Sequence, residues 1–326
     1  MNGKRHLILL LTCLLLGCGL VPTLQAQESR CPADTPLADK TNWMRLLADT
    51  IAAYDVVLPG THDSGAQHGG ALLQTQDLDI AAQLEAGVRA FDIRLREQKG
   101  QLGLYHSHAF QHVYWESDVL PALVNFLKRN PSEFLVVSLK CEGGEAADYR
   151  RLLSQSLSQE TYSPYFLTNW TVHLTLAECR GRILFLHRDE VMEHYPGVRC
   201  EGWADNATCL LTLRTAQGNT TQVLLQDEYQ YKSAAEAPKK LEAILSSLRQ
   251  MHRPDKSATY RSGISFISAT AYPYATPKQF AKRLNGAVAE RIAAEHLTPR
   301  GILFIDFIGL PGGKQLVEQL IRSNFH

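Results

Sequence analysis

The chain has 326 residues, of which 45% are hydrophobic, and this is enough for one large domain or for two smaller ones. Lys plus Arg equals Asp plus Glu at 33 each, so the overall charge gives no argument for nucleic acid as a partner. Any charge that bears on function must therefore be local.

Residues 1–26 have the pattern of a secretory signal peptide, with a basic start at Lys4 and Arg5, an apolar run over 7–16 and small residues behind it. The run is too short for a membrane span. Its end stays open: "LLGC" resembles a bacterial lipobox, which would leave Cys18 lipidated, and "LQA" before Gln27 resembles an ordinary peptidase site. In both cases we expect an exported protein that is secreted, periplasmic or lipid-anchored through Cys18.

Residues 27–50 form an N-terminal lead-in, and from residue 51 onward apolar runs alternate with helical patterns. The runs that we expect to be strands are 54–60, 88–96, 101–107, 134–140, 182–188, 221–227, 264–270 and 301–307. The helical patterns cover 79–87, 117–131, 237–251, 280–296 and 313–325. Strands separated by helices are typical of a parallel sheet, and eight of them predict a single distorted (β/α)8 barrel of the TIM type over 51–326, with mostly parallel strands. The second and third strands are joined by only 97–100, so they form a hairpin or distort the barrel there.

Polar side chains stand on or behind every one of these runs. In chain order they are His62 with Asp63, Arg94, His106, Lys140, Arg188, Asp227 with Tyr229 behind it, Ser268 and Asp306. In barrels of this type the active site lies at the carboxyl ends of the strands. An ion pair at the barrel rim explains any one of these residues alone. A ring of two histidines, three cations and three carboxylates favours a catalytic site.

This set of residues suits acid and base chemistry on an anion. Two imidazoles on separate strands, each with a carboxylate available, serve a reaction that needs one general base and one general acid near neutral pH. Lys140, Arg188 and Arg94 would give an anionic substrate a cationic floor, and arginine grips phosphate oxygens in a bidentate way. We expect a phosphodiester, with Tyr229 beside Asp227 as a platform for a polyol.

Several segments, in order along the chain, resemble the X domain of bacterial phosphatidylinositol-specific phospholipase C. They are "LPGTHDSGA" (58–66), "RAFDIRLR" (89–96), "FLKRNPSEFLVVSLK" (126–140), "GRILFLHRDE" (181–190), "QDEYQY" (226–231) and "GILFIDFIG" (301–309). The resemblance runs from about residue 51 to residue 326, and "PGTHDSG" with "FDIR" downstream is its specific signature. It implies a distorted (β/α)8 barrel and a reaction in which the inositol 2-hydroxyl attacks phosphorus. The products would be diacylglycerol and inositol 1,2-cyclic phosphate.

The resemblance also implies a role for each matching residue of this chain. His62 would be the general base on the inositol hydroxyl, oriented by Asp306. His106 would be the general acid for the leaving glycerol oxygen, coupled to Asp63, and Arg94 would stabilise charge on the phosphate. The positions that match those holding the inositol ring are Lys140, Arg188, Asp227 and Tyr229.

The family includes calcium-dependent members, which place an asparagine after the first histidine and a carboxylate where Arg94 stands, because calcium prefers oxygen ligands. Here the corresponding residues are Asp63 and Arg94. A guanidinium group would repel Ca²⁺ and can stand in for it, so we expect catalysis with no metal and no other cofactor.

The second catalytic histidine has competitors in this chain. The family usually has glycine after it, whereas this chain has "YHSHAFQH", with His106, His108 and His112 close together. Strand alternation places Leu102, Leu104 and His106 on one face, and His108 shares that face only if the strand continues. We therefore favour His106.

Five cysteines follow the signal segment, in a compartment where disulfides persist. A local bridge between Cys200 and Cys209 is the first choice, Cys141 with Cys179 is the second, and Cys31 stays free.

Aromatic residues in two segments are candidates for contact with a bilayer, since tyrosine and tryptophan favour interfaces. They are Tyr272, Tyr274, Phe110, Tyr114 and Trp115. Loop aromatics more often cap a core, which is the alternative.

The partner we expect is phosphatidylinositol or another inositol lipid, met transiently at a membrane surface by a monomer, with no nucleic acid. Two other functions remain as alternatives: a catalytically inactive inositol-lipid binding protein, and a metal-dependent barrel like the glycerophosphodiester phosphodiesterases. The sequence leaves open whether the lipid is free phosphatidylinositol or a glycosylated anchor.

Overall fold

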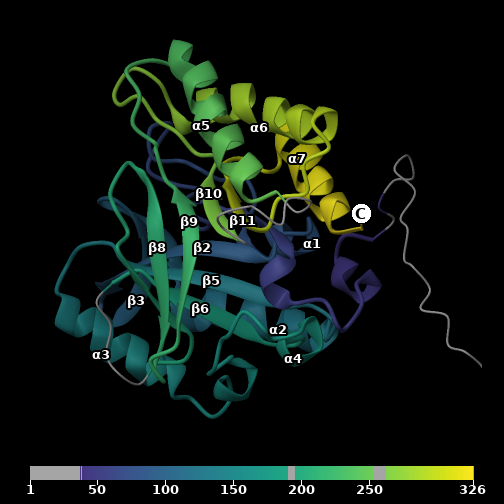
Figure 1. The fold of residues 1–326 in the computed structure, drawn as a ribbon. Coiled ribbons are helices and arrows are strands. Elements are labelled where there is room, and N and C mark those ends of the chain that lie inside the picture. Colours follow the sequence, from purple (N-terminus) through teal and green to yellow (C-terminus); the bar gives the residue numbers. More distant parts are fainter. Residues whose placement is uncertain (1–36, 38, 190–194, 253–261, 326) are drawn as a thin grey trace, which may run out of the picture.

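The computed structural model describes residues 37, 39–189, 195–252 and 262–325 (Figure 1). The expected signal peptide, its alternative end before Cys18, and Cys31 lie outside the described residues. The described residues form eleven strands: β1 (Val57–Thr61), β2 (Ala90–Gln98), β3 (Gln101–His106), β4 (Ala109–Tyr114), β5 (Leu135–Cys141), β6 (Ile183–His187), β7 (Val198–Glu201), β8 (Thr208–Thr215), β9 (Thr220–Gln226), β10 (Gly263–Phe266) and β11 (Gly301–Ile305). Their helices are α1 (Ile80–Glu85), α2 (Leu120–Arg129), α3 (Ala146–Leu157), α4 (Leu176–Cys179), α5 (Ala237–Gln250), α6 (Pro277–Ala294) and α7 (Pro311–Arg322).

Nine of the described strands close into a barrel. Their order is β1, β11, β10, β9, β8, β7, β6, β5 and β2, and β2 returns to β1 through the pairs Gly60 with Ala90 and Thr61 with Phe91. All neighbours in the ring are parallel except β8, which is antiparallel to both β7 and β9. The predicted single, distorted and mostly parallel barrel is therefore confirmed.

The composition of the ring differs from the expected eight strands. The run predicted as the third strand is β3, which lies outside the ring and forms an antiparallel meander with β2 and β4, as the short connection after β2 requires. The ring instead contains two strands that were not predicted, β7 and β8, between β6 and β9. β7 has only four residues, and in β8 Thr212 separates the buried Leu211 and Leu213 and Arg214 follows them, so neither strand has a continuous apolar run.

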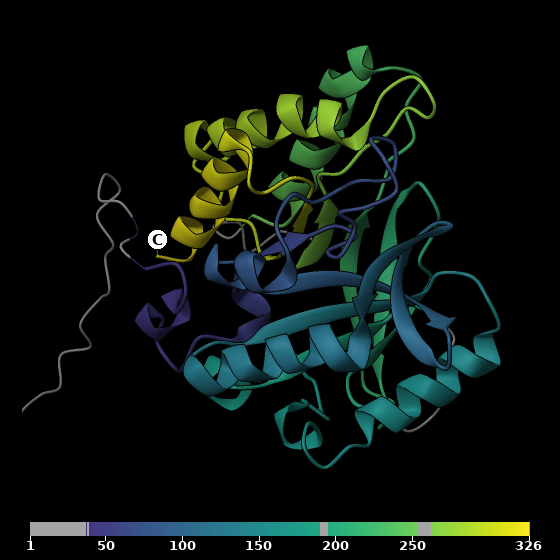
Figure 2. The ribbon, with the colours of Figure 1, turned by 180° about the vertical axis from the view of Figure 1, so that it is seen from behind.

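The helices lie outside the ring in two groups. Figure 1 shows α5, α6 and α7 beside β10 and β11, and α2, α3 and α4 on the side of β5 and β6; Figure 2 shows the same division from behind. Helix α5 buries one stripe against β9 and β10, with Ile244, Leu245 and Leu248 on it. Lys240 lies on the same buried stripe. Lys240 is therefore a charged residue at a buried helix position that an apolar side chain usually occupies.

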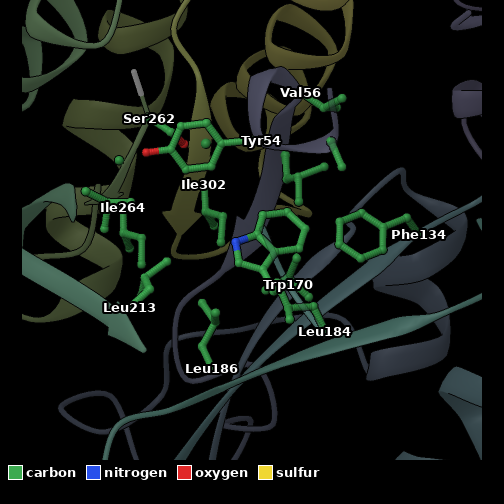
Figure 3. A pocket seen from close by; sticks show the side chains of 16 residues that line it. Tyr54, Val56, Phe134, Trp170, Leu184, Leu186, Leu213, Ser262, Ile264 and Ile302 are labelled. Atoms are coloured by element: carbon green, nitrogen blue, oxygen red, sulfur yellow. The ribbon is translucent and has the colours of Figure 1, made fainter. Parts of the chain in front are cut away.

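The barrel interior is apolar at the amino ends of the parallel strands. A cavity of about 50 Å³ lies there, and Figure 3 shows Trp170 reaching into it among aliphatic side chains. Its lining includes Leu58, Val136, Leu184, Val223, Ile264 and Ile302, one from each of six strands.

The residue four positions further along each of those strands faces the same interior at the other end, because side chains alternate with period two. These residues are His62, Lys140, Arg188, Asp227, Ser268 and Asp306. The inward-facing positions therefore carry apolar side chains at the amino end of the barrel and polar side chains at the carboxyl end.

The predicted disulfides are wrong. Cys141, Cys179, Cys200 and Cys209 are all free thiols. Cys200 pairs with Leu213 across β7 and β8, and Cys209 pairs with Leu225 across β8 and β9, so the two thiols belong to different rungs of the sheet. In the described part of the chain, no helix is long and apolar enough to cross a bilayer.

Candidate active site

His62 follows β1 and is held between a carboxylate and a guanidinium group. Its Nδ1 lies 2.8 Å from Oδ1 of Asp306, and its Nε2 lies 2.8 Å from Nη2 of Arg94. Arginine can only donate, so Nε2 carries the lone pair and Nδ1 carries the proton. Burial, followed by the charge of Arg94, lowers the pKa of His62 well below its usual value. The imidazole is therefore neutral, with its basic nitrogen directed towards Arg94.

Asp306 follows β11 and is buried behind His62. Its backbone oxygen accepts from Nδ2 of Asn285 at 2.8 Å, which fixes the turn, while Oδ2 has no hydrogen-bond partner. Burial, and then the negative charge of Asp63, raise the pKa of Asp306 well above its usual value. The carboxylate thus has a strong tendency to share the proton of His62.

Arg94, on β2, is the centre of the site. Its Nη1 lies 3.0 Å from Oδ2 of Asp63, and its Nη2 lies 3.1 Å from Oδ2 of Asp92. Burial opposes the charge of Arg94, but Asp63 and Asp92 outweigh it and raise the pKa of Arg94. The guanidinium group stays charged beside His62.

Asp63 diverges from its neighbour His62 because its backbone turns. It has φ 42°, in the left-handed region that aspartate tolerates, and its backbone N–H donates to Oδ2 of Asp92 at 3.2 Å. Its Oδ2 lies 3.4 Å from Nε2 of His106 and 3.9 Å from Nε2 of His62. The two consecutive residues therefore serve different partners.

His106 is the last residue of β3, and its imidazole, like that of His62, lies next to Oδ2 of Asp63. Its Nδ1 donates to the backbone oxygen of Leu73 at 2.6 Å, which leaves Nε2 for Asp63. The rings of His62 and His106 are 6.3 Å apart between centroids and nearly perpendicular. His108 is exposed, and its nearest polar contact is the hydroxyl of Ser107 at 3.5 Å. The structure places His106, and not His108, next to a carboxylate.

Arg188 and Asp227 form a second wall of the site. The guanidinium carbon of Arg188 lies 3.8 Å from the ring centroid of Trp203, and Nη1 lies 3.4 Å from Oδ1 of Asp92. The indole N–H of Trp203 donates to Oδ2 of Asp227 at 3.0 Å. Burial raises the pKa of Asp227, and Arg188 partly opposes this.

Lys140 and Tyr229 lie at the edges of this arrangement. Nζ of Lys140 pairs with Oε2 of Glu142 at 2.8 Å, and Oε1 of Glu142 lies 3.9 Å from Nη1 of Arg94. The hydroxyl of Tyr229 donates to Oδ1 of Asp205 at 2.9 Å. Lys140 is thus linked to Arg94 through Glu142, whereas the side chain of Tyr229 contacts Asp205.

Four residues contact the predicted site residues but had no predicted role: Asp92, Glu142, Trp203 and Asp205. Asp92 could have been predicted from the sequence, because it lies two residues before Arg94 on β2 and its side chain therefore faces the same barrel interior. Burial favours its neutral form, but Arg94 and Arg188 outweigh burial and lower its pKa. Trp203 and Asp205 lie between β7 and β8, which no pattern predicted.

No group of three or more His, Cys, Asp or Glu side chains within the described ranges is arranged to hold a metal ion. The Arg94 guanidinium group is a cation in direct contact with His62 and with the carboxylates Asp63 and Asp92.

The fold and the site define a class, namely TIM barrels with two histidines, their carboxylates and an arginine at the carboxyl rim. The sequence profile of the phosphatidylinositol-specific phospholipase C X domain matches residues 64–189. A protein of Listeria monocytogenes called 1-phosphatidylinositol phosphodiesterase is 28% identical over 345 positions, which cover 99% of this chain and 98% of that one. A protein of the same name from Staphylococcus aureus is 27% identical, over 87% of this chain and 94% of that one.

Solved structures agree with these sequence matches. A crystal structure of phosphatidylinositol-specific phospholipase C from S. aureus has a TM-score of 0.74 at 26% identity and covers 87% of this chain and 97% of that one. The enzyme from L. monocytogenes has a TM-score of 0.67 at 27% identity, with 87% and 98% covered. The chain is therefore similar over most of its length to the bacterial phosphatidylinositol-specific phospholipases C, and residues 64–189 match the X domain of that family.

Proposed function

We propose that this protein is an exported phosphodiesterase that cleaves phosphatidylinositol to diacylglycerol and inositol 1,2-cyclic phosphate without a metal ion. The observation that carries the proposal is the pair of imidazoles, 6.3 Å apart between centroids, that both lie next to Asp63, with Arg94 in contact with Asp63 and His62. This arrangement gives one phosphodiester a proton acceptor, a proton donor and a fixed positive charge at the same time.

In the first half of the reaction, Nε2 of His62 removes the proton of the inositol 2-hydroxyl, and that oxygen attacks phosphorus. Asp306 holds the Nδ1 proton and stabilises the imidazolium ion that forms. Arg94 stands beside Nε2 and stabilises the negative charge on the non-bridging oxygens.

In the second half, the bond from phosphorus to the glycerol oxygen breaks. Nε2 of His106, protonated beside Asp63, gives its proton to that oxygen, and diacylglycerol leaves. The phosphate remains on the inositol as a five-membered cyclic diester. One proton is taken up by His62 and one is given by His106, so the enzyme ends with its proton on the other histidine.

The inositol ring is proposed to lie against the second wall of the site. Asp227 accepts hydrogen bonds from ring hydroxyls, Arg188 and Lys140 donate, and Tyr229 offers its ring face. Asp92 and Trp203 hold Arg188 from two sides, which keeps the donor group in one orientation.

Contact with a membrane surface is proposed for the loop behind β10, on the same end of the barrel as the site. Tyr272 and Tyr274 are 72% and 82% exposed there. Trp115, one of the other aromatic candidates, is excluded because it is fully buried and donates to Ser156.

The test is incubation of the protein with phosphatidylinositol labelled in the inositol ring, with and without EDTA. Inositol 1,2-cyclic phosphate is expected as the first labelled product in both samples. Release of non-cyclic inositol phosphate from the start, or activity that EDTA abolishes and calcium restores, would contradict the proposal.

A further inference from the structure

Lys240 is a buried cation outside the catalytic ring. It lies on α5 with 0% of its surface exposed and reaches towards the carboxyl end of β9. Its Nζ donates to the backbone oxygen of Glu228 at 2.5 Å and to Oε1 of Gln226 at 3.2 Å. Both acceptors are neutral, so these contacts satisfy its donors without neutralising its charge.

The two residues that Lys240 holds lie on either side of Asp227 in the chain. Asp227 is itself buried, and so is Asp306 at the end of the second strand along. Asp306 leaves one carboxylate oxygen without a hydrogen-bond partner. The site therefore contains two buried carboxylates whose charge the hydrogen bonds of the site only partly compensate.

The charged groups whose fields favour the protonated form of Lys240 are Asp227 and Glu228 behind β9 and Asp306 behind β11. The relation is mutual, since the charge of Lys240 lowers the pKa of Asp227 and of Asp306. Burial lowers the pKa of Lys240 itself to about 7, and the three acids oppose this. Tyr231, whose ring packs against Phe280 of α6, is not a counter-charge because burial raises the pKa of its hydroxyl further above the usual value and keeps it neutral near pH 7.

We propose that Lys240 is a positioning residue. From the helix layer its ammonium group fixes the end of β9 that carries Asp227, and it adds a second positive charge, beyond that of Arg188, near the buried Asp227 and Asp306 carboxylates. Lys240 does not touch the substrate; it acts through these two residues. The proposal rests on the proposed function for its link to catalysis, whereas its electrostatic part concerns the protein alone.

The electrostatic part is tested by NMR, without turnover. The indole N–H of Trp203 donates to Asp227, so the pH dependence of its ¹H–¹⁵N signal, assigned with Trp203→Phe, reports the protonation of that carboxyl group. In Lys240→Met the midpoint of this titration is expected to rise by about one pH unit. Lys239→Met, an exposed neighbour on the same helix, should leave it unchanged. An unchanged midpoint in a folded Lys240→Met variant would overturn the proposal.

A reciprocal measurement needs no substitution at position 240. Because linkage is mutual, Asp227→Asn must lower the pH at which the ¹³Cε signal of Lys240 titrates. This signal is recognised by its titration near neutral pH. If the midpoint stays where it is in the parent protein, the coupling does not exist and the proposal fails, whether or not Lys240→Met folds.

Turnover separates positioning from a purely structural role. The ratio of kcat/KM for Lys240→Met to that of the parent is expected to be about 0.1 at pH 6 and to recover as the pH rises to 8, because more of the carboxyl groups ionise. A constant ratio across this range would show a structural effect only. If the parent protein does not cleave phosphatidylinositol, the proposed function fails, and the two NMR titrations still decide the electrostatic role of Lys240.

Discussion

The contact of 2.8 Å between Nδ1 of His62 and Oδ1 of Asp306 decides which nitrogen of His62 carries the proton. It is a consequence of strand register, because Thr61 pairs with Ile305 and the next residue of each strand therefore faces the same interior. Asp306 accepts the hydrogen bond from Nδ1–H, and the lone pair on Nε2 accepts one from Nη2 of Arg94. The base is thus preset before substrate binds.

Asp306→Asn is expected to lower kcat by about 10²- to 10⁴-fold. An asparagine side chain can donate to Nδ1, and this would shift the proton of His62 to Nε2, where the base must be free. Since burial raises the pKa of Asp306, the charged carboxylate costs stability at neutral pH, and its removal should leave the melting temperature unchanged or higher. Kinetics and thermal unfolding on the same preparation check this. A lower melting temperature would mean that the rate loss reflects damage to the fold.

His106→Ala should lower the rate with phosphatidylinositol by about 10²- to 10⁴-fold, and His108→Ala should change it less than about twofold. The reason is the contact of His106 with Asp63, which the exposed His108 lacks. A second substrate tests the role: an inositol phosphodiester with a p-nitrophenolate leaving group needs no general acid. It should restore most of the rate to His106→Ala and almost none to His62→Ala. Equal losses on both substrates would show that His106 is not the acid.

The barrel could be predicted from the sequence because seven of its strands lie on runs rich in apolar or β-branched residues that helical patterns or turns separate, with polar residues at or behind their ends, as β1 ends before His62 and β11 before Asp306. The alternation of side chains along a strand also identified the residues that face the barrel interior, since the residue four positions after an interior residue faces the interior again. β7 and β8 escaped because one is four residues long and the other alternates polar and apolar positions.

The site was predictable only as far as strand ends define it. Trp203 and Asp205 escaped because they lie between the two strands that were missed. Lys240 escaped for a different reason: a lysine on an amphipathic helix is expected in solvent, and only the packing of α5 against β9 shows it to be buried. The disulfide prediction failed because proximity in sequence does not fix the rung of a sheet on which a cysteine stands.

Arg94→Lys is expected to lower kcat by about 10²- to 10³-fold, although the charge is kept. The guanidinium group contacts Asp63 through Nη1 and both Asp92 and His62 through Nη2, and a single ammonium group cannot reach all three. The measurement is kcat with phosphatidylinositol. Arg94→Ala provides a second readout, because added guanidinium ion should restore part of its rate while added methylammonium ion should not. Equal recovery with both ions would argue that charge alone is required.

Trp203→Phe is expected to raise KM for phosphatidylinositol about tenfold with kcat changed less than about threefold. Phenylalanine keeps a ring over the Arg188 guanidinium group but loses the N–H that donates to Asp227. Trp203→Ala removes both interactions and should lower kcat/KM further, by about another tenfold. Steady-state kinetics of the two variants, side by side, separate the hydrogen bond from the stacking contact. If Phe and Ala behave alike, the stacking contact contributes nothing measurable.

The burial of His187 predicts how the free energy of unfolding changes as the pH falls, and this prediction does not depend on the proposed reaction. It ends β6, is 2% exposed, and donates from Nε2 to the backbone oxygen of Pro196 at 2.8 Å, while Nδ1 has no partner. Burial lowers the pKa of His187 to about 4, below the value of 6.5 that applies in the unfolded chain. Between these two values the unfolded chain binds a proton that the native protein does not. The stabilisation is therefore complete above about pH 6.5 and is lost as the pH falls towards 4.

The loss that His187 contributes over this range is roughly 3 kcal/mol. His187→Gln keeps a donor for Pro196 and cannot titrate, so its free energy of unfolding should fall less steeply with decreasing pH than that of the parent, even if it is lower at pH 7. Urea unfolding at pH 7, 5.5 and 4.5 measures the slopes. The exposed His173→Gln serves as the matched control and should keep the parent slope. Burial lowers the pKa of His62 as well, so His62 also makes the native protein less stable as the pH falls. The slope for His187→Gln is therefore expected to be smaller than that of the parent but not zero. Equal slopes for His187→Gln and the parent would show that His187 is protonated in the native protein.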